Sequence, residues 1–219
     1  MLELSTIQQI AVWILPVLFA ITFHEAAHAW VAYKLGDNTA MMLGRLSFNP
    51  INHIDPIGSV VVPIVTLIIS NFSFVFGWAK PVPIRSSNFA NPRRDLAIAT
   101  AAGPLANLLM AFLWAGCMKL ALLTNPQGSM VAVFVILAAK AGILINLVLA
   151  FLNLIPLPPL DGSKIVMAFL SARQSIKYEK IEPFGFFILL ALMFTGVLSW
   201  LISPPINMSW SVLRSIFNL

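Results

Sequence analysis

His24-Glu25-Ala26-Ala27-His28 lies inside an apolar run, residues 7–33, that is long enough to cross a lipid bilayer as a helix. Two histidines four residues apart share one face of a helix and can bind one zinc ion, and the glutamate between them can act as a general base. Two imidazoles and a carboxylate are costly to bury in hydrocarbon, so function is the default explanation for their presence there. The stretch predicts an intramembrane zinc hydrolase.

The composition is that of a membrane protein. Of 219 residues, 59% are hydrophobic and 10% are charged, whereas a soluble domain averages about 25% charged residues. The net charge of +5 comes from lysines and arginines that lie mainly in a few loops between apolar runs, where the positive-inside rule explains it better than nucleic-acid binding does. The single cysteine, Cys117, excludes an intramolecular disulfide. We therefore expect the lipid bilayer as a partner and no nucleic acid.

Four apolar runs meet the requirement of about 20 residues for a membrane-spanning helix, namely residues 7–33, 96–123, 130–156 and 184–203. They predict a single integral-membrane domain over residues 1–219, with a catalytic core of about 7–170 and accessory helices over 184–219. Pro204-Pro205 is expected to end the last run, and residues 207–219 are expected to form a short interfacial helix.

The segment near 57–79 decides the topology. Its apolar part is short, and its second half carries aromatic residues at alternate positions, which is typical of a strand. If the segment re-enters, the basic loops 34–56, 79–95 and 162–182 all face the cytoplasm, as the positive-inside rule requires; if it spans, two of them move outside. We therefore expect an all-α polytopic membrane protein with about four to five transmembrane helices and a re-entrant helix and β-strand segment. The strand over 71–79 is expected to offer a free edge to an extended substrate peptide.

A catalytic zinc ion needs a third protein ligand beside the two histidines, and Asp161 is the best candidate. The prolines of Pro156-Leu157-Pro158-Pro159 stop the preceding helix and favour an extended segment before the carboxylate. His24 lies about 26 Å below the outer surface at 1.5 Å per residue, and in the re-entrant topology Asp161 arrives at the same level. The alternative role of Asp161 is to cap the helix that follows it.

Two further polar residues are candidates for catalysis. Glu25 follows His24 and points to the neighbouring helix face, where it could take a proton from the attacking water and pass it to the leaving amine. Asn107 lies in the second span at a depth where its amide could donate to the oxyanion of the transition state. The alternative for Asn107 is helix–helix packing, which is also the favoured interpretation of Asn146 and Asn153.

The chain resembles the site-2 protease family of intramembrane zinc metalloproteases. Three motifs occur in the family's order: the His24–His28 pentapeptide, Gly103-Pro104-Leu105-Ala106-Asn107, and the proline-rich run that closes with Leu160-Asp161-Gly162. The run Gly44-Arg45-Leu46-Ser47-Phe48-Asn49-Pro50 resembles a compact subgroup without an inserted PDZ or CBS domain.

The resemblance implies a role for each matching residue. It places one zinc ion per chain on three ligands, makes the glutamate the base, sets the asparagine of the second motif near the scissile carbonyl, and marks a second asparagine at a recurrent position that we take as a substrate contact. These residues are His24, His28 and Asp161 for the metal, Glu25 and Asn107 for catalysis, and Asn107 and Asn153 for substrate binding.

The resemblance also implies an endopeptidase that cleaves membrane-anchored proteins in regulated intramembrane proteolysis. We expect it in a bacterial plasma (inner) membrane, with the site near the cytoplasmic side; the sequence does not indicate an oligomeric state. Two other functions stay open, a metal or proton transporter with these side chains as its transit site, and an inactive homologue that only binds membrane segments. Glu25 separates the endopeptidase from the transporter, because a transporter needs no general base.

Overall fold

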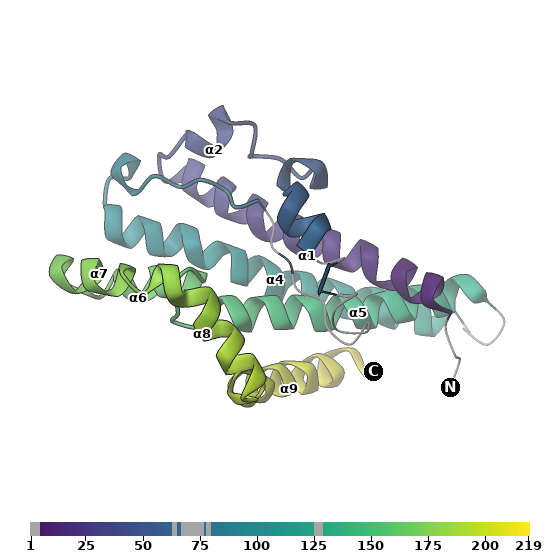
Figure 1. The fold of residues 1–219 in the computed structure, drawn as a ribbon. Helices are drawn as coiled ribbons and strands as arrows, with labels where there is room; N and C mark the ends of the chain where they lie inside the picture. The colour runs from purple at the N-terminus through teal and green to yellow at the C-terminus, as the bar shows by residue number, and fades with distance from the viewer. Residues whose placement is uncertain (1–4, 63–64, 67–76, 78–79, 125–128) are drawn as a thin grey trace.

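The computed structural model describes residues 5–62, 65–66, 77, 80–124 and 129–219, and within these ranges the chain is helical and contains no strand. Three helices are long and apolar enough to cross a membrane (Figure 1), namely α1 (Thr6–Lys34), α4 (Pro92–Leu123) and α5 (Met130–Asn153). A fourth span results if α8 (Glu182–Phe194) and α9 (Val197–Phe217) count as one broken helix. The predicted class, an all-α polytopic membrane protein, is confirmed.

Short helical elements occupy the connections. After α1 come α2 (Thr39–Met42), the 3-10 turn η1 (Pro50–His53), the π-helical turn η2 (Pro56–Val61) and the 3-10 turn η3 (Ser86–Asn88). The segment between α5 and α8 contains α6 (Asp161–Met167) and α7 (Ala172–Glu179).

Local signals in the sequence fix where the long helices begin. Ser5 caps α1, because its hydroxyl accepts the Gln8 N–H at 3.3 Å while the Gln8 side chain accepts the Ser5 N–H at 3.0 Å, a reciprocal capping box. Pro92 occupies the first turn of α4, where its missing N–H costs nothing. The Ser129 hydroxyl accepts the Ala132 N–H at the start of α5.

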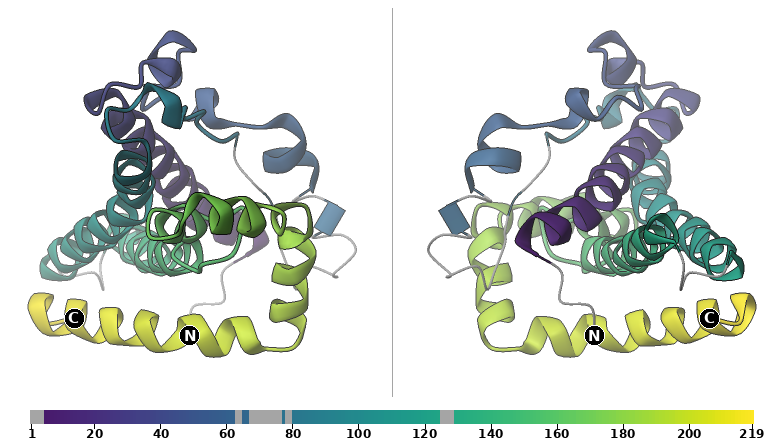
Figure 2. Two further views of the ribbon diagram at one scale, coloured as in Figure 1. Left: turned by 90° about the vertical axis from the view of Figure 1, so that its left-hand side faces the viewer. Right: turned by 90° about the vertical axis from the view of Figure 1, so that its right-hand side faces the viewer.

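The helices α1, α4 and α5 pack as one bundle, and α9 lies along one side of it (Figure 2). Small residues line the contact between α4 and α5, which lets the two backbones approach closely. Ala111 and Ala115 of α4 form a core cluster with Ile143 and Leu147 of α5, and Leu213 of α9 joins it.

The run 184–203 does not form the single helix that the sequence predicts. Gly196 takes the left-handed conformation with φ of +77°, and a glycine in that conformation closes a helix. The helix α8 therefore ends at Phe194, and α9 leaves it at an angle of 78°.

The prediction that Pro204-Pro205 end a helix is also wrong. The helix α9 runs through both prolines to Phe217, so residues 207–219 are not a separate interfacial helix. Ile206 and Trp210 pack against the α4–α5 core beyond the prolines, and such tertiary packing supplies most of the stability of a helix in a protein.

Only the first part of the segment near 57–79 lies within the described residues. There, Asp55 caps η2, since its carboxylate accepts the N–H groups of Ile57 at 3.0 Å and Gly58 at 2.7 Å. Most of the segment beyond Val62 lies outside the described residues, so the re-entrant path and the strand over 71–79 stay predictions.

A buried carboxylate joins the segment after α1 to the segment before α4. Asp37 is fully buried, and it accepts hydrogen bonds from the Thr39 N–H and hydroxyl, the Arg85 N–H at 2.7 Å and the Asn88 amide at 2.8 Å. Burial alone would raise the pKa of Asp37, but the hydrogen bonds from Thr39, Arg85 and Asn88 outweigh it and hold that pKa below its ordinary value. The bonds fix the end of α1 relative to the start of α4.

We predict that Asp37→Asn lowers the free energy of unfolding at neutral pH by about 1–3 kcal/mol, the cost of leaving buried donors unpaired. The folded-state pKa is depressed, so the ionised carboxylate stabilises the fold above its ordinary pKa and this stabilisation is lost as the pH falls through the folded-state pKa. Thermal unfolding of the two proteins in detergent should therefore differ at pH 7 and become equal only at a second, acidic pH below the folded-state pKa, which itself lies below the ordinary value of about 4. Glu179→Gln, at an exposed site, is the control and should match the wild type at both pH values; an equal deficit for Asp37→Asn at both would contradict the assignment.

Candidate metal centre

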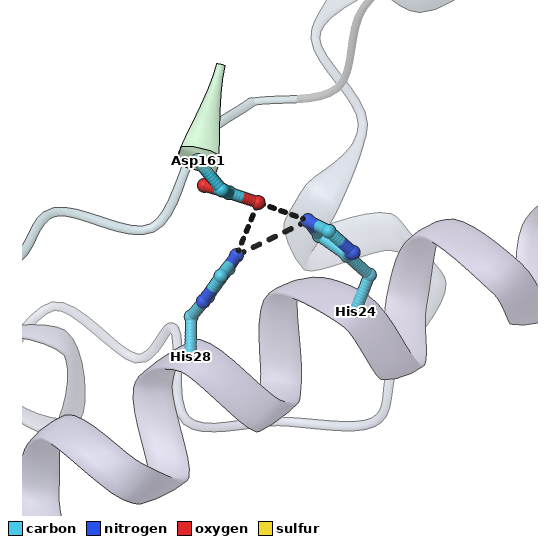
Figure 3. Close-up of side chains that lie close together, drawn as sticks. All are labelled: His24, His28 and Asp161. Carbon is cyan, nitrogen blue, oxygen red and sulfur yellow. Dashed lines mark hydrogen bonds and ion pairs between the residues drawn. The ribbon is translucent and has the colours of Figure 1, made fainter. Parts of the chain in front are cut away.

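Three side chains that were predicted as metal ligands converge in the structure (Figure 3). His24 Nε2 lies 3.1 Å from Asp161 Oδ2, and His28 Nε2 lies 3.3 Å from the same oxygen. The two Nε2 atoms are 3.1 Å apart. The histidines come from adjacent turns of α1 and the aspartate from the first residue of α6, more than 130 residues later in the sequence, so the fold rather than local sequence makes the cluster.

The cluster is shielded from solvent. His24 is 7% exposed, His28 is 6% exposed and Asp161 is 9% exposed. Polar groups at such burial need partners, because an unpaired one costs several kcal/mol.

Both imidazoles are held from behind through Nδ1. His28 Nδ1 lies 2.9 Å from the carbonyl oxygen of Ala99 on α4, and a carbonyl can only accept, so this nitrogen carries the hydrogen and donates. His24 Nδ1 lies 2.6 Å from Oδ1 of Asn107, also on α4. In its neutral form each ring therefore turns the lone pair of Nε2 towards Asp161, which is the arrangement of metal-binding histidines with an outer partner.

The donor set fits a divalent cation. The facing atoms are two imidazole lone pairs and a carboxylate oxygen, and Asp161 Oδ2 has no hydrogen-bond partner within the described residues. Zinc–ligand bonds of about 2.0–2.1 Å in tetrahedral geometry set ligand atoms about 3.4 Å apart. The observed separations of 3.1–3.3 Å are close to that spacing, so the three residues could hold zinc and leave a fourth position open.

Gly103 provides the space for the two rings. A Cβ atom at this position of α4 would lie 2.4 Å from His28 Nε2 and 2.7 Å from His24 Cε1. Any larger residue would displace the imidazoles, so the glycine belongs to the structure of the site.

The position of Asp161 depends on a close contact between the start of α6 and the end of α5, at Gly162. A Cβ at Gly162 would lie 2.3 Å from the carbonyl oxygen of Leu154 at the end of α5. Gly162 lies within α6 and has no positive φ, so the glycine serves close packing rather than a sharp turn. The N-cap of α6 is Leu160 and not Asp161, which removes the capping alternative for the carboxylate.

The helices α7 and α8 contact the proline-rich segment that carries Asp161. The Tyr178 hydroxyl of α7 donates to the carbonyl oxygen of Pro156 at 2.6 Å. A Cβ at Gly185 of α8 would lie 1.7 Å from the carbonyl oxygen of Pro158. The helix α8, which begins the predicted accessory region, and the preceding helix α7 therefore both fix the backbone that leads to Asp161.

Glu25 is half-buried beside the cluster, on the neighbouring face of α1. Its Oε2 accepts the backbone N–H of Val82 at 2.9 Å, so the segment before α4 orients the carboxylate. Nothing in the sequence indicates this contact, because Val82 is a hydrophobic residue in a proline-rich loop.

The two predicted asparagines behave differently. Asn107 lies behind His24, and its amide donates to the Ala20 carbonyl at 3.0 Å and to Asn146 Oδ1 at 2.9 Å. Asn153 is half-buried, and its amide donates to Leu149 of its own helix at 3.0 Å. Within the described part of the chain, Asn107 joins the centre and Asn153 does not. The sequence analysis did not predict that Asn146 contacts Asn107 at the centre. The signal that could have indicated it is the cost of burying an amide inside a membrane span.

Comparison with known proteins agrees with the site. Residues 116–196 match the sequence profile of Peptidase family M50. The chain is 35% identical over 208 residues to YwhC of Bacillus subtilis, named as a zinc metalloprotease, covering 94% of this chain and 90% of that protein. It is 28% identical over 182 residues to Rip2 of Mycolicibacterium smegmatis, also named as a zinc metalloprotease, covering 83% of this chain and 66% of that protein. No solved structure matches.

The fold and the site thus define a multi-pass membrane metalloendopeptidase. The chain belongs to Peptidase family M50, the family of site-2 proteases, as its motifs indicated.

We predict that Gly103→Ala lowers zinc affinity at least about tenfold, because the new methyl group occupies the place of both imidazoles. Chelator competition on the detergent-purified protein measures the effect. Gly116→Ala on the same helix is the matched control, since its Cβ would meet only the Phe217 ring at 3.6 Å, an ordinary contact. Wild-type zinc affinity in Gly103→Ala would show that the rings do not need this space.

Proposed function

We propose that the protein is an intramembrane endopeptidase that uses one zinc ion, held by His24, His28 and Asp161, to hydrolyse a peptide bond of a membrane-anchored protein. The observation that carries the proposal is the convergence of three acceptor groups inside an apolar helical bundle, next to a carboxylate that is not part of the cluster. Family membership favours this hydrolase over the transporter or the inactive homologue.

The chain's own residues divide the work. A zinc ion held by the cluster would polarise the scissile carbonyl and lower the pKa of the attacking water from 15.7 to about 7. Glu25, oriented by the Val82 N–H, takes the proton of that water as its oxygen adds to the carbonyl carbon, and delivers it to the amine nitrogen as the carbon–nitrogen bond breaks. Because the carbonyl of a helical peptide is engaged in its own hydrogen bond, the substrate must be unwound at the cleaved bond.

The charge distribution supports an active site near the cytoplasmic side of a bacterial inner membrane. The end of α1, the start of α4, and α6 with α7 gather at one end of the bundle (Figure 1). These elements carry Lys34, Arg93, Arg94, Lys164, Arg173 and Lys177, and by the positive-inside rule this cluster of basic residues favours a cytoplasmic position for that end. His24 lies ten residues before Lys34, or about 15 Å along the helix.

Glu25→Gln tests the general base. The glutamine oxygen can still accept the Val82 N–H, so we expect the fold and the zinc content to be retained while the cleavage rate falls by about 10²–10⁴-fold. The assay uses a membrane-anchored reporter in proteoliposomes, and proteomics of membrane fractions should reveal anchored proteins that accumulate uncut. Glu179→Gln should cleave at the wild-type rate. Cleavage by Glu25→Gln at more than a tenth of that rate would remove Glu25 from the role.

Asp161→Ala tests the third ligand. We expect the zinc content of the purified protein to fall below one ion per chain, and zinc affinity to fall by more than the roughly 10–100-fold that loss of an outer partner costs. Elemental analysis and chelator competition measure the two quantities, with Glu25→Gln as the variant that keeps its zinc. One tightly bound zinc ion per chain in Asp161→Ala would contradict the ligand set.

A further inference from the structure

A chain of buried amides extends from His24 away from the metal centre. His24 Nδ1 contacts Oδ1 of Asn107 at 2.6 Å, and the Asn107 amide contacts Oδ1 of Asn146 at 2.9 Å. The Asn146 amide in turn contacts the carbonyl oxygen of Gly142 at 2.8 Å. Both asparagines are 0% exposed. The three side chains come from α1, α4 and α5, so the chain of bonds crosses the whole bundle.

The direction of every hydrogen in this chain follows from its backbone ends. The carbonyls of Gly142 and Ala20 can only accept. The Asn146 nitrogen therefore faces Gly142 and the Asn107 nitrogen faces Ala20, which leaves Asn146 Oδ1 to accept the second Asn107 hydrogen. The Asn107 oxygen is then the group that faces His24, and it can only accept.

The result is a fixed tautomer for one metal ligand. His24 carries a hydrogen on Nδ1 and turns Nε2 towards Asp161 and His28 (Figure 3), so the neutral ring offers the lone pair of Nε2 to a metal ion. His28 gains the same tautomer from the backbone carbonyl of Ala99. The orientation of His24 therefore depends on side chains, which a mutation can remove, whereas that of His28 depends on a backbone carbonyl.

We propose that Asn146 is a positioning residue of the metal centre, which acts through Asn107 to hold His24 as a neutral, Nε2-directed ligand. This inference rests on the proposed zinc function. It also changes the role of Asn107. Both of its amide hydrogens are engaged with Ala20 and Asn146, so Asn107 acts on His24 rather than as a donor to the substrate oxyanion.

A pure packing role makes a different prediction. Amides join membrane helices, and loss of such a bond costs about 0.6–2 kcal/mol of stability. Packing alone would therefore lower the unfolding temperature of an Asn146 variant and leave the zinc affinity of the folded protein unchanged. Positioning lowers the zinc affinity, and does so through Asn107.

The experiment measures the zinc dissociation constant by chelator competition, and the visible spectrum after cobalt substitution, on the full-length protein in detergent. Asn146→Leu should weaken zinc binding by about 10–100-fold and alter the cobalt spectrum. Asn146→Thr should recover part of the loss, because a helical threonine hydroxyl can donate to the carbonyl four residues earlier and still accept from Asn107. It is also the variant to use if Asn146→Leu does not fold.

Further variants test whether Asn146 affects zinc binding through Asn107 or through helix packing. Ile143→Ala removes a fully buried side chain from the α4–α5 core without touching the amides, so it should lower the unfolding temperature and keep wild-type zinc affinity. Asn107→Ala should lose zinc affinity, and the double variant with Asn146→Leu should lose no more than Asn107→Ala alone, because the two act in series.

The outcomes are distinct. Unchanged zinc affinity in Asn146→Leu, or in Asn107→Ala, would overturn the positioning role while leaving the proposed function in place. Additive losses in the double variant would also overturn it, since Asn146 would then act by another route. A wild-type protein that binds no zinc would overturn both.

Discussion

The structure depends on holding together two imidazoles and a carboxylate, three groups that could bind a cation, where little solvent reaches them. Two imidazole lone pairs and a carboxylate oxygen lie 3.1–3.3 Å apart in a site less than a tenth exposed. Such groups repel one another unless a proton or a metal ion lies among them. The fold holds each ring through Nδ1, the nitrogen that faces away from the cluster. The backbone carbonyl of Ala99 accepts from His28, and the side-chain oxygen of Asn107 accepts from His24. The rings are therefore oriented before any cation arrives.

Close packing around the cluster follows from the same constraint. Gly103 and Gly162 stand where any Cβ would strike an imidazole or a backbone carbonyl. A glycine inside a helix destabilises it by about 0.5–1 kcal/mol relative to alanine. Here that cost is offset by the approach of α4 to α1 and of α6 to the end of α5. The alanines at the α4–α5 interface likewise let two helix backbones approach closely elsewhere in the bundle.

The sequence predicts the class of fold and the three convergent residues, because polar side chains in hydrocarbon are rare and their depth can be counted along a helix. It does not predict the hydrogen-bond partners of Asn107, since hydropathy fixes the position of a helix along the membrane normal but not its rotation about its own axis. The break at Gly196 is also hidden. A glycine barely alters the hydropathy of an apolar run, and the packing of Ile206 and Trp210 that carries α9 past its prolines comes from distant residues.

The contacts of α7 and α8 with the proline-rich segment give the C-terminal helices a mechanical connection to the metal centre. Gly185 leaves no gap between α8 and Pro158, and Tyr178 fixes Pro156. A tilt of α8 would therefore displace the short stretch of backbone that ends in Asp161. Bilayer thickness acts on the tilt of membrane helices, so a change of thickness that tilts α8 would reach the position of the Asp161 carboxylate through this backbone.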